Sequence, residues 1–125
     1  MITGIGVDLV MINRMEHWLE DSKLLERYFH SDEVSLLSSR KNSAQTLAAR
    51  FAAKEAFGKA LGTGLADINL KDIAVFNNEN GKPELKLFGT ALKAFEKSGA
   101  TRAYISLSHE KDNAIAMIVL ENDHH

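Results

Sequence analysis

Two carboxylates and one lysine stand out in the sequence because their types suit a site for a phosphorylated ligand. Asp8 follows Gly4 and Gly6 in an apolar N-terminal stretch, while Glu55 and Lys59 lie one helical turn apart in an alanine-rich segment. Mg²⁺ is usually held by one or two carboxylates together with waters and substrate phosphates, and lysine can neutralise further phosphate charge. These residues therefore indicate a magnesium–phosphate site, although nothing in their spacing proves that Asp8 and Glu55 meet in space.

The segment around Glu55 is basic in a chain that is acidic as a whole. The chain has 15 Lys and Arg residues against 17 Asp and Glu residues, a formal net charge of −2. Residues 43–62 hold Arg50, Lys54 and Lys59 against Glu55 alone, a local charge of +2. Residues four apart share a helix face, so the alternative is a solvated helix whose Glu–Lys pair contributes about 0.2–0.5 kcal/mol.

Gly62-Thr63-Gly64 and His109 are weaker candidates. A glycine-rich turn can cradle a phosphate, but this one ends a predicted helix, where the dipole disfavours anions and glycine is typical of a C-cap. His109 lies between two predicted strands, where a histidine is more often incidental than catalytic. The sequence contains no P-loop, no H-E-x-x-H zinc motif and no G-x-S-x-G nucleophile motif.

Length and composition exclude several classes of protein. The 125 residues are 45% hydrophobic and 26% charged, which is ordinary for one globular domain. The absence of cysteine excludes disulfide scaffolds, thiol catalysis and cysteine-based zinc sites. The net charge of −2 argues against a general nucleic-acid binder, and no apolar run approaches the roughly 20 residues of a transmembrane helix. Residues 1–6 lack the features of a signal peptide, so a cytoplasmic protein is expected.

The N-terminal stretch 2–12 is predicted to be a buried strand. Alternation places Gly4, Gly6 and Asp8 on one face, which the glycines leave bare beside the carboxylate. Glycine weakens a strand, and its usual compensation is close approach by a ligand or another backbone. The alternative is a bulge or tight packing, with Asp8 capping the next segment.

The best helix signal begins near residue 43, reaches Leu61 and ends at the glycines of residues 62–64. Its alanines recur every fourth residue, which makes a ridge narrow enough for close packing: Ala48, Ala52, Ala56 and Ala60. Earlier, residues 13–29 are predicted to be helical with a break near Asp21-Ser22, and Ser31 is predicted to N-cap a short helix. A polar connection is predicted at residues 40–43.

The remainder of the chain carries the signals of short strands, tight turns and one short helix. Asn80-Gly81 is a hairpin signal, and the expected elements are strands at 68–76, 83–88, 102–108 and 113–121 with a helix at 90–98. The last strand is nearly all apolar and is expected to be central. These elements predict an α+β fold with a largely antiparallel sheet packed against a long central helix. We expect a single domain over residues 1–121 and a tail over 122–125, with His124-His125 interpreted as a tag remnant.

Two stretches resemble the motifs of the 4′-phosphopantetheinyl transferases. Residues 4–8, with Arg14 six residues on, resemble the first motif, and residues 50–64 resemble the second, a Lys-Glu-Ala helix. The match is closest to the short bacterial branch, the holo-acyl-carrier-protein synthases, which residues 78–83 and 106–109 also resemble. The resemblance covers the whole chain in order, and the helix motif is long and specific.

The resemblance implies transfer of 4′-phosphopantetheine from coenzyme A to a serine of apo-acyl carrier protein, leaving adenosine 3′,5′-bisphosphate. It assigns Mg²⁺ to Asp8 and Glu55, which would act in catalysis together with Lys59. It also implies a set of residues that bind coenzyme A: Arg50, Phe51, Lys54, Lys59, Gly62, Thr63, Gly64 and His109. Glu55 and a water held by the metal are both candidates for the general base.

The resemblance also implies partners. The acyl carrier protein is small and acidic, so basic side chains near the site should attract it. Arg14 is the best docking candidate, and Lys23 and Arg27 are weaker ones. Short members of the family form homotrimers with coenzyme A bound between subunits, and 125 residues are few for enclosing coenzyme A and a protein together.

Two other functions use the same residues. A Mg²⁺-dependent nucleotide phosphohydrolase could employ the same carboxylates, and a small interaction module could carry the Lys-Glu-Ala helix as a merely solvated one.

Overall fold

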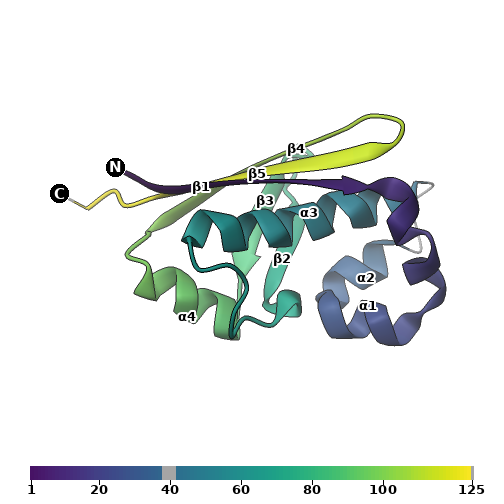
Figure 1. The fold of residues 1–125 in the computed structure, drawn as a ribbon, viewed down its shortest axis with the longest axis horizontal. Helices are drawn as coiled ribbons and strands as arrows, with labels where there is room; N and C mark the ends of the chain where they lie inside the picture. The colour runs from purple at the N-terminus through teal and green to yellow at the C-terminus, as the bar shows by residue number, and fades with distance from the viewer. Residues whose placement is uncertain (38–41, 125) are drawn as a thin grey trace.

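Helix α3 (Ser43–Leu61) crosses the middle of the molecule, as the computed structural model shows. A three-stranded sheet lies on one side of this helix and the remaining helices lie on the other, while a two-stranded sheet runs past the helix and reaches the level of the larger sheet (Figure 1). The structure describes residues 1–37 and 42–124. Within these ranges no helix has the length and apolar character needed to cross a membrane.

Both sheets are antiparallel. The larger has the order β1-β5-β4, with β1 at Ile2–Met11, β5 at Asn113–Glu121 and β4 at Arg102–His109. The smaller is the hairpin of β2 (Ile73–Asn77) and β3 (Pro83–Leu87). The predicted α+β class and the central position of the last strand are confirmed, but the strands form two sheets rather than one.

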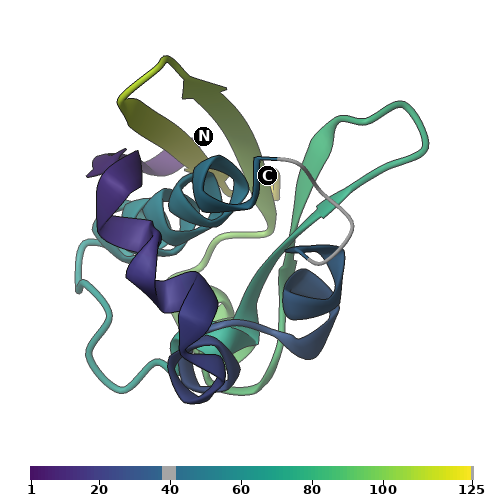
Figure 2. The same cartoon turned by 90° about the vertical axis from the view of Figure 1, so that its right-hand side faces the viewer.

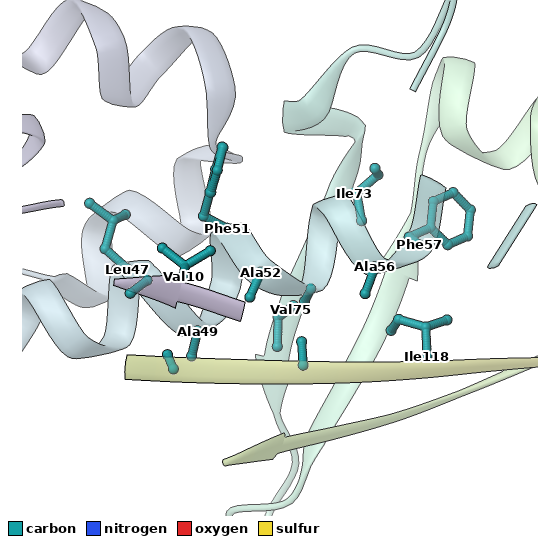
Figure 3. Packing of buried hydrophobic residues seen from close by; sticks show 14 of the residues in the cluster. Val10, Leu47, Ala49, Phe51, Ala52, Ala56, Phe57, Ile73, Val75 and Ile118 are labelled. Carbon is teal, nitrogen blue, oxygen red and sulfur yellow. The ribbon is translucent and has the colours of Figure 1, made fainter. Parts of the chain in front are cut away.

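Helix α3 supplies much of the core and is buried nearly all round. Its predicted range is confirmed, and it ends at Gly62, whose φ of 83° is the left-handed conformation of a glycine C-cap. Figure 3 shows Ala56 on the side of α3 that faces β5, where Ile118 points toward it, and Phe51 pointing away from that strand. The helix therefore has no single apolar stripe, because sheet and helices cover different sides of it.

The bare glycine face of β1 is explained by the backbone of α3. A Cβ at Gly4 would lie 1.8 Å from the carbonyl oxygen of Ala60, and one at Gly6 would lie 1.9 Å from that of Ala56. No side chain fits at either position. Of the interpretations left open, close approach by another backbone in tight packing is confirmed, together with a register irregularity between Ile2 and Gly4.

The segment between β1 and α3 forms two 3₁₀ turns, η1 (Ile12–Met15) and η2 (His17–Glu20), followed by helices α1 (Ser22–Tyr28) and α2 (Ser31–Leu37). The predicted break is confirmed, because the Asp21 carboxylate accepts hydrogen bonds from the backbone N–H groups of Lys23 and Leu24.

The predicted N-cap at Ser31 is wrong. Ser31 is already helical, and the cap is one residue earlier, where Nδ1 of His30 accepts from the backbone N–H of Asp32 at 3.1 Å. The polar connection predicted at 40–43 lies largely outside the described residues.

The β2–β3 hairpin turns through Gly81, with a φ of 81°. The predicted strand before it begins at Ile73 rather than Ile68, because residues 70–72 form a 3₁₀ turn, η3 (Leu70–Asp72). The hairpin projects from the body of the molecule on the side of α2 (Figure 2). The short helix predicted at 90–98 is α4 (Gly89–Lys97).

Candidate active site

Asp8 of β1 and Lys59 of α3 meet where the glycines let strand and helix approach. The Lys59 ammonium donates to Oδ1 of Asp8 at 2.9 Å and to the carbonyl oxygen of Val7 at 3.2 Å. Asp8 is half-buried and Lys59 is exposed. The structure thus joins two of the predicted catalytic residues across the contact between β1 and α3.

Glu55 belongs to the same cluster. Burial raises the pKa of its carboxyl above the ordinary value, and the Asp8 carboxylate nearby raises this pKa further. Lys59 and Arg14 act in the opposite direction and lower the pKa of Glu55. Arg14, predicted for docking, therefore lies within electrostatic reach of Glu55, and the cluster contains two carboxylates and two cations.

The Asp8–Glu55 pair fits a divalent cation that completes its shell with waters and ligand phosphates. Two carboxylates that repel each other gain from a cation between them, and oxygen is the donor that Mg²⁺ prefers. No group of three or more His, Asp or Glu side chains suited to a metal is present within residues 1–37 and 42–124. A cation held here would therefore depend on oxygen donors from its ligand.

Arg50 and His109 line a second feature, a groove of about 460 Å³ between α3, the β2–β3 hairpin and β4. Nε2 of Gln45 lies 2.6 Å from Nδ1 of His109, which links α3 to the end of β4 across the groove. The opposite wall comes from the hairpin, with Asn77, Gly81 and Pro83.

The groove and the Asp8–Glu55–Lys59 cluster lie on different sides of α3. At 3.6 residues per turn, position 59 is about 180° around the helix from position 50. One chain therefore does not bring all of its predicted ligand-binding residues to one place.

The structure gives Lys54 buried protein partners rather than an open position for a phosphate. Its side chain is completely buried, and its ammonium donates to Oε1 of Glu33 at 2.8 Å, to the carbonyl oxygen of Leu70 at 3.0 Å and to that of Ile73. A lysine ammonium has three hydrogens, and these partners use all of them. Burial lowers the pKa of Lys54, while Glu33 opposes this shift.

Phe51 also belongs to the core rather than to a binding surface. It is buried, and its ring centroid lies 5.5 Å from that of Trp18. Gly62 and Gly64 have positive φ, and the N–H of Gly64 donates to the carbonyl oxygen of Gly58 at 3.0 Å, so these glycines close the helix. A ligand-binding role for residues 62–64 stays a prediction.

Lys23 and Arg27 are exposed on α1, and Arg14 is exposed on η1. The Arg27 guanidinium lies over the ring of Tyr28, 5.2 Å from its centroid. The role of Lys23, Arg27 and Arg14 in docking a carrier protein stays a prediction.

Sequence reasoning missed two residues, Glu33 and Gln45. Glu33 is buried in α2 and Gln45 contacts His109 across the groove. Neither has a local signal, because both roles come from segments distant in the chain.

The outer face of the three-stranded sheet is apolar and exposed. No described helix or strand covers it (Figure 1). The large side chains exposed on these strands come from all three: Ile2, Ile5, Val7, Leu9, Met11, Tyr104, Ile115 and Met117. Contiguous apolar surface of this kind marks an interaction site.

Residues 4–118 match a family described as the 4′-phosphopantetheinyl transferase superfamily. The chain is similar to the holo-[acyl-carrier-protein] synthase of Treponema denticola, with 56% identity covering 97% of this chain and 99% of that protein.

Among solved structures, the chain resembles the holo-[acyl-carrier-protein] synthase (AcpS) from Neisseria meningitidis. The TM-score is 0.88 and the identity 33%, covering 98% of this chain and 100% of the other. It also resembles a holo-(acyl-carrier-protein) synthase from Bacillus anthracis in complex with CoA (3′,5′-ADP), with a TM-score of 0.81 and 36% identity over 98% and 99% of the two chains.

Proposed function

Because the chain belongs to the 4′-phosphopantetheinyl transferase superfamily, as an enzyme of the holo-acyl-carrier-protein synthase branch, we propose that it modifies an acyl carrier protein with coenzyme A as donor. A serine oxygen of the apo carrier forms a bond to the phosphorus next to the pantetheine. The bond from that phosphorus to the bridging oxygen breaks, and adenosine 3′,5′-bisphosphate leaves. The observation that carries this proposal is the convergence of Asp8, Glu55 and Lys59.

Asp8 and Glu55 would hold Mg²⁺, which when bound neutralises charge on the diphosphate. Phosphoryl transfer depends mainly on positioning and on electrostatic stabilisation, so a cation at the leaving phosphate lowers the barrier. Lys59 supplies such a cation from the chain itself, because its exposed ammonium can turn from Asp8 to a phosphate oxygen.

Glu55 and a water held by the metal are the two candidates for accepting the serine proton. Asp8 is already paired with Lys59. Arg14 is close enough to Glu55 to act on its pKa, so a carrier held at Arg14 would present its serine near this carboxylate. Lys23 and Arg27 would extend this basic surface toward an acidic partner.

The nucleotide end of coenzyme A would occupy the groove of Arg50 and His109. Since this groove and the Asp8–Glu55–Lys59 cluster lie on different sides of α3, one coenzyme A would use the groove of one subunit and the cluster of its neighbour. The apolar outer face of the sheet supports such self-association, and a homotrimer is the assembly that we propose. Sedimentation of a fully active monomer would overturn it. The cytoplasmic location stays a prediction.

The reaction is tested by the intact mass of an apo carrier protein incubated with this chain, coenzyme A and Mg²⁺. We expect the mass of one phosphopantetheine to be added, and we expect Asp8→Asn or Glu55→Gln to abolish the addition. Glu96→Gln, an exposed change on α4, serves as the matched control.

Two outcomes favour the other functions. Release of adenosine 3′,5′-bisphosphate without any carrier indicates a phosphohydrolase, and calorimetry that detects no coenzyme A binding, with or without Mg²⁺, indicates an interaction module.

A further inference from the structure

A buried ion pair that the proposed reaction does not use directly joins α3, α2 and the β2–β3 hairpin. Lys54 of α3 and Glu33 of α2 lie 2.8 Å apart, both almost completely buried. Oε1 of Glu33 also accepts from the backbone N–H of His30 at 3.0 Å, and Oε2 accepts from that of Val75 at 3.1 Å. Together with the bonds from Lys54 to Leu70 and Ile73, these contacts form the Glu33–Lys54 cluster.

The cluster takes the place of a neighbouring strand at the open edge of β2. Residues two apart in a strand direct their backbone groups to the same edge. Ile73 and Val75 are such a pair, and their carbonyl and N–H bind Lys54 and Glu33 rather than a strand. The other edge of β2 is paired with β3. An isolated two-stranded hairpin is marginally stable at best, so this second set of bonds holds the hairpin to α2 and α3.

The same hairpin forms one wall of the groove that contains Arg50 and His109. Asn77, two residues beyond Val75, lines the groove together with Gly81 and Pro83. The facing wall is α3, where Arg50 lies one turn before Lys54. The cluster thus ties the two walls together next to the groove.

We propose that Glu33 and Lys54 are positioning residues that set the separation of the two groove walls and thereby the affinity for the nucleotide end of coenzyme A. This inference rests on the proposed function, because it takes the groove as the nucleotide site. It assigns the Lys-Glu-Ala helix motif two distinct tasks: its glutamate acts at the reacting phosphate, and its first lysine acts through the hairpin.

The decisive variant is the double replacement Glu33→Met with Lys54→Met. Removing one partner alone leaves a buried charge and risks unfolding, whereas apolar replacement of both partners of a buried ion pair is often tolerated. We expect the KM for coenzyme A and the Kd for adenosine 3′,5′-bisphosphate to rise about tenfold or more, since small misplacements of binding groups have effects of this size. We expect kcat at saturating coenzyme A and the KM for the carrier to stay within about twofold.

The matched control is Arg102→Met, which removes one partner of the exposed Arg102–Asp123 ion pair at the far end of β4 from His109. Unchanged coenzyme A affinity in a folded double variant overturns the inference, as does an equal loss in kcat and in the KM values of both substrates. Absence of coenzyme A binding to the unaltered chain contradicts the proposed function itself.

A second measurement uses the unaltered chain and remains decisive if the double variant does not fold. Hydrogen exchange of the Val75 N–H should slow in the presence of adenosine 3′,5′-bisphosphate, because a ligand that binds between the walls stabilises the closed edge. An exchange rate that saturating ligand leaves unchanged would show that the cluster and the groove are not coupled.

Discussion

Helix α3 carries two lysines that each pair with a carboxylate at almost the same distance, yet the two pairs are opposite in character. Lys54 lies 2.8 Å from Glu33, with the side chains 0% and 1% exposed, whereas Lys59 lies 2.9 Å from Asp8, with the side chains 56% and 18% exposed. Distance therefore says little about what an ion pair does. Burial and the number of other hydrogen-bond partners decide whether the two side chains of an ion pair stay together or can bind a ligand instead.

The angular position on the helix produces this difference. Positions 54 and 59 are about 140° apart around the axis. Lys54 points into the space closed by α2 and the hairpin, while Lys59 points to the rim beside β1. The free energy of unfolding provides one scale on which the two pairs can be compared.

The largest effect is expected for Lys54→Met alone. Glu33 would keep its charge in a buried site without an opposite charge, which destabilises a protein by about 3–5 kcal/mol. Urea denaturation with fitted m-values measures this loss. A loss comparable to that of an exposed pair would remove the contrast between the two lysines.

Gly6→Ala is expected to come next. Its Cβ would lie 1.9 Å from the carbonyl oxygen of Ala56, so β1 must move away from α3. Overpacking of this kind destabilises by about 1–3 kcal/mol, and the shift should also separate Asp8 from Lys59. The unfolding temperature and the rate of carrier modification should both decrease in this variant. If stability falls and activity does not, the close approach of β1 to α3 is not what positions Asp8.

Glu55→Gln is expected to stabilise the chain slightly at pH 7. The folded state raises the pKa of Glu55 above its ordinary 4.5, so the native chain binds the proton more tightly than the unfolded chain. Stability then falls as the pH rises from about 4.5 through the raised pKa. The increase in stability that Glu55→Gln produces should therefore become smaller as the pH is lowered toward 4.5. Unfolding temperatures measured from pH 4 to 8, with Asp8→Asn in parallel, test this sign.

The smallest effect on stability is expected for Lys59→Met. Exposed ion pairs contribute about 0–1 kcal/mol, and added salt should reduce the difference further. Activity should nevertheless fall about 10²–10³-fold, since a cation aimed at developing charge is worth far more in catalysis. Comparison with Lys54→Met in one urea series and one activity assay gives the contrast directly. Equal stability losses in the two variants would contradict it.

Features with local causes could be predicted from the sequence. The ends of α3, the hairpin at Gly81 and the central β5 result from glycine, turn and apolar signals that lie within each element. The sequence also predicts the glycine face of β1, but it does not predict that the backbone of α3 packs against this face.

The burial of Lys54, which the sequence does not predict, has a tertiary cause. The spacing of Arg50 and Lys54 correctly indicates one side of the helix, but α2 and the hairpin cover that side at position 54. No residue near Lys54 in the sequence indicates its pairing with Glu33, which is 21 residues away. The local sequence around a motif lysine therefore does not distinguish a lysine that binds a ligand from one that binds a buried carboxylate.

The Glu33–Lys54 cluster also bears on the order in which the chain folds. Its side chains and all their hydrogen-bond partners lie between His30 and Val75, whereas the pairing of β1 with β5 joins Ile2 to Glu121. Closing a short loop loses less chain entropy than joining the two ends. We therefore expect residues 30–75 to contain the folding nucleus and β1 to dock afterwards. Strand β1, which carries Asp8, would then dock last. The proposed active site would therefore form only when the rest of the chain has folded.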